Sequence, residues 1–110
     1  MRRVSFDSNV LVYTVDRRDR RHARAIDLVA RAVQADCVLS VQSVAEFYHV
    51  VTRKHSAPAD EAQAQVEDML VSFPSVTYDA AALGRAIAAA RRHGLALWDA
   101  LLWATVAAAG

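Results

Sequence analysis

Short apolar runs alternate with longer segments of helical periodicity along this chain. The runs at 4–6, 38–40 and 75–78 predict three strands. Apolar positions at helical spacing predict helices at about 8–15, 22–35, from 40 or 43 to 55, 58–73 and 80–92, and a last one from near Trp98. This alternation predicts an α/β fold with a parallel sheet flanked by helices, in a single domain that spans residues 1–110.

Residues suited to helix ends support these borders. Asp7 or Ser8 can accept hydrogen bonds from the free amides in the first turn of the first helix, and Asp79 can do the same for the helix at 80–92. Pro58 fits the first turn of the fourth helix. Gly94 can take the left-handed conformation that ends a helix.

Composition and charge exclude several classes of protein. The 110 residues are 55% hydrophobic and 23% charged, which is typical of a globular domain rather than a disordered chain. The net charge is +1, so any nucleic-acid site must be formed by local charge. The single cysteine, Cys37, suits a reducing cytoplasm. No apolar run approaches the roughly 20 residues of a membrane span.

Three acidic residues occur in segments that are otherwise apolar. Asp7 follows the first predicted strand, Glu46 lies in the helix after the second, and Asp99 lies in the first turn of the last helix. Ligands of open α/β sheets bind beyond the carboxyl ends of the strands, so we expect the three acids to meet there. Two unit charges about 4 Å apart repel by roughly 4 kcal/mol at an effective dielectric near 20, so such a cluster needs protons or a cation. Mg²⁺ or Mn²⁺ prefers these oxygen ligands, and the predicted chemistry is phosphodiester hydrolysis.

Each acid also has a purely structural interpretation. Asp7 can be a helix cap alone. Asp99 can be a first-turn acid that interacts with the helix dipole, which is worth about 0.3 to 1 kcal/mol when exposed. Glu46 fits a solvated helix face less well, because its neighbours in the sequence are apolar.

The three acids lie in the segments VSFDSNVLVY at 4–13, SVAEFYHV at 43–50 and LWDALLWA at 97–104. In order and spacing these segments resemble the three acidic motifs of the PIN-domain ribonucleases, and most of all the VapC-type toxins of bacterial toxin and antitoxin pairs. The resemblance implies a three-layer α/β/α fold, Mg²⁺ or Mn²⁺ as cofactor, RNA as substrate, a homodimer and a cognate antitoxin. It also implies Asp7, Glu46 and Asp99 as the catalytic, metal-binding residues, with Asn9 supporting them through hydrogen bonds. We therefore expect a cytoplasmic, metal-dependent endoribonuclease.

The sequence departs from this family in one respect. Family members usually continue past the last helix with a strand that carries a fourth acid, whereas this sequence ends at Gly110. The resemblance therefore implies a C-terminally incomplete domain with one sheet edge uncovered. The alternative function is a PIN-like remnant that binds RNA or an antitoxin without cleaving.

Other residues have weaker claims to a functional role. The segment 16–24 has five Arg against two Asp. Its candidate phosphate contacts, which would position RNA without reading its sequence, are Arg17, Arg18, Arg20 and Arg21. An equally good interpretation is that segment 16–24 is a solvated turn with no role in RNA binding. Trp98 and Trp103 can stack on bases, but their apolar surroundings favour packing in the core or in a dimer.

Two other chemistries fit the sequence less well. Glu46 and His49 have the Glu-x-x-His spacing of di-iron bundles, but the sequence has no second copy of this motif. The four histidines show no pairing pattern that would support metal-free acid and base catalysis.

Overall fold

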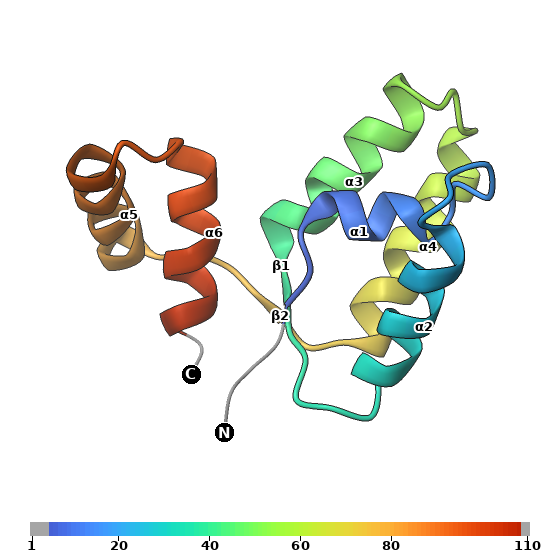
Figure 1. Cartoon of the computed structure of the whole chain (residues 1–110), viewed down its shortest axis with the longest axis horizontal. Coiled ribbons are helices and arrows are strands. Elements are labelled where there is room, and N and C mark those ends of the chain that lie inside the picture. Colours follow the sequence, from blue (N-terminus) through green and yellow to red (C-terminus); the bar gives the residue numbers. More distant parts are fainter. Residues whose placement is uncertain (1–4, 109–110) are drawn as a thin grey trace.

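The computed structural model of the chain describes residues 5–108. Helices lie on both sides of a small parallel sheet, with α1 to α4 on one side and the α5–α6 pair on the other (Figure 1). In chain order the elements are α1 (Ser8–Tyr13), α2 (His22–Ala32), β1 (Leu39–Ser40), α3 (Val41–Arg53), α4 (Ala59–Ser72), β2 (Ser75–Val76), α5 (Ala80–His93) and α6 (Leu97–Ala108). The predicted α/β fold with a parallel sheet flanked by helices is confirmed.

The sheet is smaller than the sequence predicts. β1 and β2 pair in parallel, with Leu39 opposite Ser75 and Ser40 opposite Val76. The predicted strand at 4–6 is not formed by its described residues, since Ser5 and Phe6 have irregular backbone, and residue 4 lies outside the described residues. Phe6 instead packs against the core just before the first helix begins. A sheet this small is marginal by itself, so packing of the helices must hold it in place.

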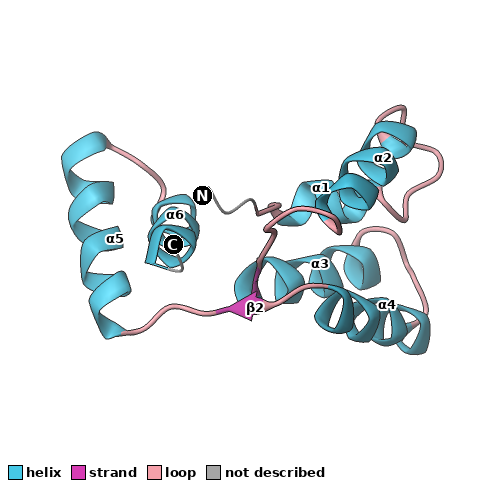
Figure 2. Ribbon diagram, turned by 90° about the horizontal axis from the view of Figure 1, so that it is seen from below, coloured by secondary structure: helices cyan, strands magenta, loops and turns pink. Residues whose placement is uncertain are grey.

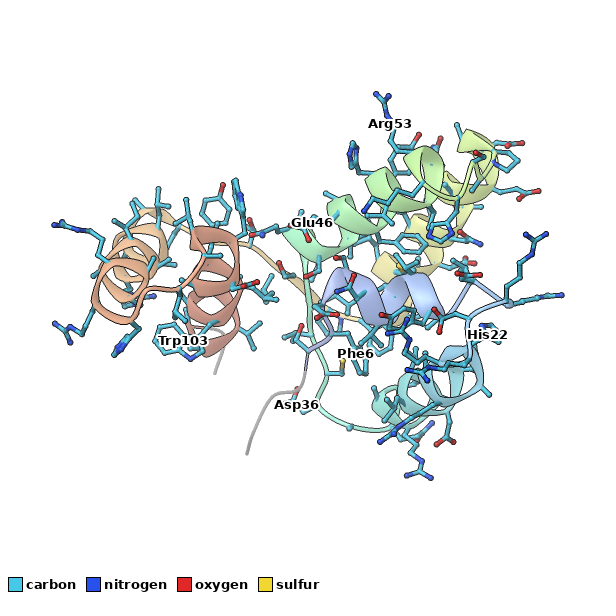
Figure 3. The ribbon with its side chains drawn as sticks, turned by 45° about the horizontal axis from the view of Figure 1, so that its top comes forward. Phe6, His22, Asp36, Glu46, Arg53 and Trp103 are labelled. Carbon is cyan, nitrogen blue, oxygen red and sulfur yellow. The ribbon has the colours of Figure 1, made fainter. Side chains whose placement is uncertain are left out.

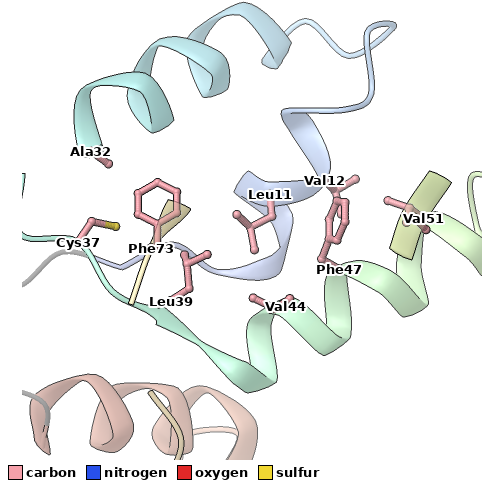
Figure 4. Close-up of a cluster of buried hydrophobic side chains, with 10 residues drawn as sticks. Leu11, Val12, Ala32, Cys37, Leu39, Val44, Phe47, Val51 and Phe73 are labelled. Atoms are coloured by element: carbon pink, nitrogen blue, oxygen red, sulfur yellow. The ribbon is translucent and has the colours of Figure 1, made fainter. Parts of the chain in front are cut away.

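The main hydrophobic core lies between α1, α2, α3 and α4 (Figure 4). Phe47 of α3 is fully buried at its centre, and Val44 and Val51 lie on the same face, as the helical spacing predicts. Tyr48, at helical spacing from Val44, is nevertheless 39% exposed, because it lies one residue, or about 100°, further round the helix than Phe47. The remaining buried members of the cluster are Leu11, Val12, Ala32, Cys37, Leu39, Ala62 and Phe73.

α5 and α6 form a helix pair (Figure 2). Between them lies a separate apolar cluster that consists mostly of alanine side chains. Its buried members are Ala82, Ala86, Ala100, Leu101 and Ala104. Beyond this pairing, α6 also contacts β1. Trp98 near the start of α6 lines a pocket with Gln42 near the start of α3, so the two helix starts lie close together. Trp98 and Trp103 of α6 are each 60% exposed, so they do not pack in the core, and the predicted alternative of packing in a dimer stays a prediction.

The predicted helix ends are confirmed at three positions. Val10 N donates to Asp7 Oδ1 at 3.1 Å, and Ala82 N donates to Asp79 Oδ1 at 2.8 Å. Gly94 ends α5 in the left-handed conformation, with φ 66° and ψ 29°.

Within residues 5–108, the helices are too short or too polar to cross a membrane.

Candidate active site

The three predicted acids come from three elements of the fold. Asp7 caps α1, Glu46 lies in the middle of α3, and Asp99 lies in the first turn of α6. All three side chains are exposed, although the sequence around each of them is apolar. Glu46 and Asp99 lie on outward helix faces next to one buried neighbour each, Phe47 and Ala100, and Asp7 lies at the exposed N-cap of α1.

Glu46 is held by hydrogen bonds to both of its carboxylate oxygens. Ser8 Oγ donates to Oε2 at 3.1 Å, and Gln42 Nε2 donates to Oε1 at 3.2 Å. The first bond joins residues 38 positions apart and ties the start of α1 to α3. The second joins residues four apart on one helix face. The carboxylate of Glu46 is therefore fixed in orientation, although it is exposed.

The sequence does not mark these two partners as site residues. Ser8 fits the pattern of a helix cap alone, and Gln42 belongs to none of the motifs described above. The spacing of four residues between Gln42 and Glu46 was the available signal for the second. No local pattern points to the contact between Ser8 and Glu46, because it depends on how α1 packs against α3.

A pocket of about 430 Å³ lies beside Glu46 and is lined by residues from all three acidic segments. Figure 3 shows Glu46 at the part of α3 that faces α6. The lining residues, which come from the start of α1, one face of α3 and the start of α6, are Ser8, Gln42, Ala45, Glu46, His49, Val50 and Trp98. The direct sequence neighbours of Asp7 and Asp99 thus line the same pocket as Glu46.

The acids themselves are not gathered into one cluster. Within residues 5–108, no three His, Cys, Asp or Glu side chains form a group that could hold a metal ion. This separation avoids the repulsion that three clustered carboxylates would suffer without a cation. The available donors are carboxylate, hydroxyl and amide oxygens, and the side-chain oxygen of Gln42 is buried without a hydrogen-bond partner among the described residues. This donor set fits a hard divalent cation in kind.

Asn9 and the predicted arginines lie outside this pocket. The Asn9 side chain is exposed and makes no hydrogen bond with another residue in the described part of the chain, so its supporting role stays a prediction. Arg17 and Arg18 line a different cavity, of about 390 Å³, together with His55 at the far end of α3. Arg20 is exposed in the same turn.

Arg21 is engaged in local contacts. Its Nε and one terminal nitrogen donate to the two carboxylate oxygens of Asp19 at 2.9 and 3.0 Å, and its guanidinium lies 4.2 Å from the centre of the Tyr13 ring. The hydrogen bonds from Arg21 lower the pKa of Asp19 to about 2. The basic segment follows the end of α1, whereas Asp7 precedes its start, so α1 separates the two.

Comparisons with known proteins agree with the fold. The PIN domain family model matches residues 4–110. The crystal structure of VapC20 from Mycobacterium tuberculosis, a sarcin–ricin loop cleaving toxin, superimposes with a TM-score of 0.74 at 20% sequence identity, covering 91% of this chain and 78% of that one. No curated protein matches the sequence. Since the family model spans nearly the whole chain, this protein belongs to the PIN domain family.

Proposed function

We propose that this chain is a metal-dependent endoribonuclease and the toxin of a type II toxin and antitoxin pair. The observation that carries this proposal is the meeting of three acidic segments at one pocket, in which both oxygens of Glu46 are already held. An oriented carboxylate beside a recess is suited to catalysis, because it loses little entropy when the substrate arrives. Membership in the PIN domain family supports the same activity.

In this proposal Asp7, Glu46 and Asp99 hold Mg²⁺ or Mn²⁺. When bound, the ion neutralises the carboxylates, lowers the pKa of a bound water and stabilises charge on the phosphate. Ser8 and Gln42 keep Glu46 in place. Asn9 is proposed to orient the neighbouring acids.

The proposed partners are RNA, a cognate antitoxin and a second copy of the chain, in the cytoplasm. Arg17, Arg18 and Arg20 are proposed as phosphate contacts at a distance from the pocket. The apolar side chains exposed just before and at the start of α6, Leu95 and Leu97, supply surface for a protein partner or a dimer.

A PIN-like module that binds RNA or an antitoxin without cleaving is the second candidate. The observation in its favour is that the acids form no cation-binding group within residues 5–108. The two functions differ in one measurable property, since both predict binding and only the first predicts cleavage.

The decisive experiment is cleavage of a mixed structured RNA pool by the purified chain, with Mg²⁺ or Mn²⁺ and with EDTA. The test variant is Asp99→Asn, because Asp99 is exposed and makes no hydrogen bond with another described residue, so the fold should tolerate the change. The matched control is Asp68→Asn, which removes an exposed acid from α4, outside the pocket. We expect cleavage by the parent and the control, and none by Asp99→Asn or in EDTA.

Two results would decide against the first function. Equal cleavage by Asp99→Asn and Asp68→Asn would show that Asp99 is not in the site. RNA binding by a folded parent chain that does not cleave would favour the second candidate. Thermal stability gives an independent check on the metal, since an ion present at 100 times its Kd stabilises the native state by about 2.7 kcal/mol.

A further inference from the structure

We infer that the pocket beside Glu46 is a base-binding subsite, in which one unpaired nucleobase of the RNA stacks on Trp98. The inference rests on the proposed ribonuclease function and goes beyond it, because it names the part of the substrate that enters the pocket and the side chain that holds it.

The size and position of the pocket support a small occupant next to the proposed catalytic residues. Its volume of about 430 Å³ lies within the range of roughly 300 to 1,000 Å³ that is usual for small-molecule sites. Glu46 and His49, one turn apart on α3, lie on one side, and Trp98 comes from the start of α6. A group bound here is adjacent to the carboxylate that we propose for the reaction.

The chemistry of the lining favours a base over a phosphate. Ala45, Val50 and Trp98 present mainly apolar surface, and the polar groups of Ser8 and Glu46 lie at the same pocket. No Arg or Lys of the described residues lines it, so a phosphate would find no permanently charged side-chain cation there, and His49 is the one lining side chain among these residues that can be protonated. A nucleobase has an apolar face for stacking and a polar edge for hydrogen bonds, and it matches this mixture.

The exposure of Trp98 indicates that its ring is available. The side chain is 60% exposed, although it is among the largest apolar groups of the chain. Base stacking on an aromatic side chain requires an accessible face and a base that is not paired or stacked elsewhere. We therefore assign the occupant as an unpaired base next to the cleaved phosphate.

Trp103 is a matched control for Trp98. It belongs to the same helix, is equally exposed at 60%, and does not line the pocket. Figure 3 shows it on the side of α6 that is turned away from Glu46. A general effect of removing an exposed tryptophan from α6 should therefore appear in both variants, whereas loss of base stacking should appear in one.

The first measurement is kcat/KM for cleavage of one RNA by the parent, Trp98→Ala and Trp103→Ala. Stacking is worth about 1 to 3 kcal/mol per base, so we expect Trp98→Ala to lower kcat/KM by roughly 5- to 150-fold and Trp103→Ala by less than about twofold. When one base next to the cleavage site is removed from the same RNA, kcat/KM of the parent should fall by a similar factor. The kcat/KM of Trp98→Ala should be the same for the abasic RNA and the intact RNA. Equal kcat/KM for the two alanine variants, or an abasic penalty that persists in Trp98→Ala, would overturn the inference.

The second measurement does not depend on cleavage. In a chain that carries Asp7→Asn and Trp103→Phe, Trp98 is the only tryptophan. A short single-stranded RNA should quench its fluorescence, and the same backbone with all bases removed should not. Quenching without cleavage by the parent would support the subsite and contradict the ribonuclease function. Cleavage without base-dependent quenching would contradict the subsite alone, and the pocket would then be assigned to a side chain of a protein partner.

Discussion

Asp7 combines a structural role with a proposed catalytic one, and two substitutions separate them. Its Oδ1 accepts a hydrogen bond from Val10 N at 3.1 Å and so caps α1, and its carboxylate is a proposed metal ligand. Asp7→Asn removes the charge and keeps a good capping residue, whereas Asp7→Ala removes both. We expect both variants to lose cleavage and only Asp7→Ala to lose stability.

The expected loss follows from the local geometry. Replacing a capping Asp by Ala costs about 1 kcal/mol, within a range of 0.5 to 2. Asp7 is exposed, so its removal adds little loss of packing. α1 has only six residues and is too short to be stable alone, but Leu11 and Val12 anchor it in the core, so it should not unfold separately. For a chain of about this size, 1 kcal/mol lowers Tm by roughly 4 °C.

The assay combines thermal unfolding, followed by circular dichroism, with RNA cleavage. The matched control is the same pair of substitutions at Asp79, which caps α5 through a bond of 2.8 Å from Ala82 N. Asp79→Ala should lower Tm like Asp7→Ala, and neither Asp79 variant should affect cleavage. Cleavage by Asp7→Asn at the parent rate would refute the site assignment, and equal Tm values for Asp7→Asn and Asp7→Ala would refute the capping argument.

Three further predictions concern the fold. Phe47→Ala should lower the free energy of unfolding, measured with urea, by about 3 to 5 kcal/mol, because the ring is fully buried. Tyr48→Ala at the exposed neighbour should lower it much less, and similar losses for the two variants would place the core elsewhere. Gly94→Ala should lower Tm by the equivalent of about 1 to 2 kcal/mol, because φ is +66° there, and an unchanged Tm would contradict this backbone conformation. Burial raises the pKa of the Cys37 thiol, so the stability it contributes is complete below its ordinary pKa and is lost as the pH rises through the raised value. Tm of the parent should therefore fall more steeply in alkaline solution than Tm of Cys37→Val, and parallel curves would contradict the shift.

The helices could be predicted because the interactions that define them are local. The spacing of Val44, Phe47 and Val51 marks one face of α3, and this face packs in the core. Asp79 and Gly94 mark the two ends of α5 through hydrogen bonds and backbone conformation within a few residues. The strands were predicted less well, because pairing depends on a partner that is distant in the sequence. This explains why residues 5 and 6 form no strand despite a suitable apolar pattern.

The sequence alone determined the order of the helices and three of their ends, the α/β class and the three acidic segments of the candidate site, since periodicity, capping and motif spacing are properties of neighbouring residues. Only the tertiary structure decided that Ser8 donates a hydrogen bond to Glu46 across 38 positions and that Trp98 is exposed at the pocket beside Glu46. It also decided that the arginine-rich segment 16–24 lies beyond the end of α1 that is opposite to Asp7. These features depend on how α1, α3 and α6 pack against one another. Such packing is set by the shapes of buried surfaces from distant segments, which no local pattern in the sequence records.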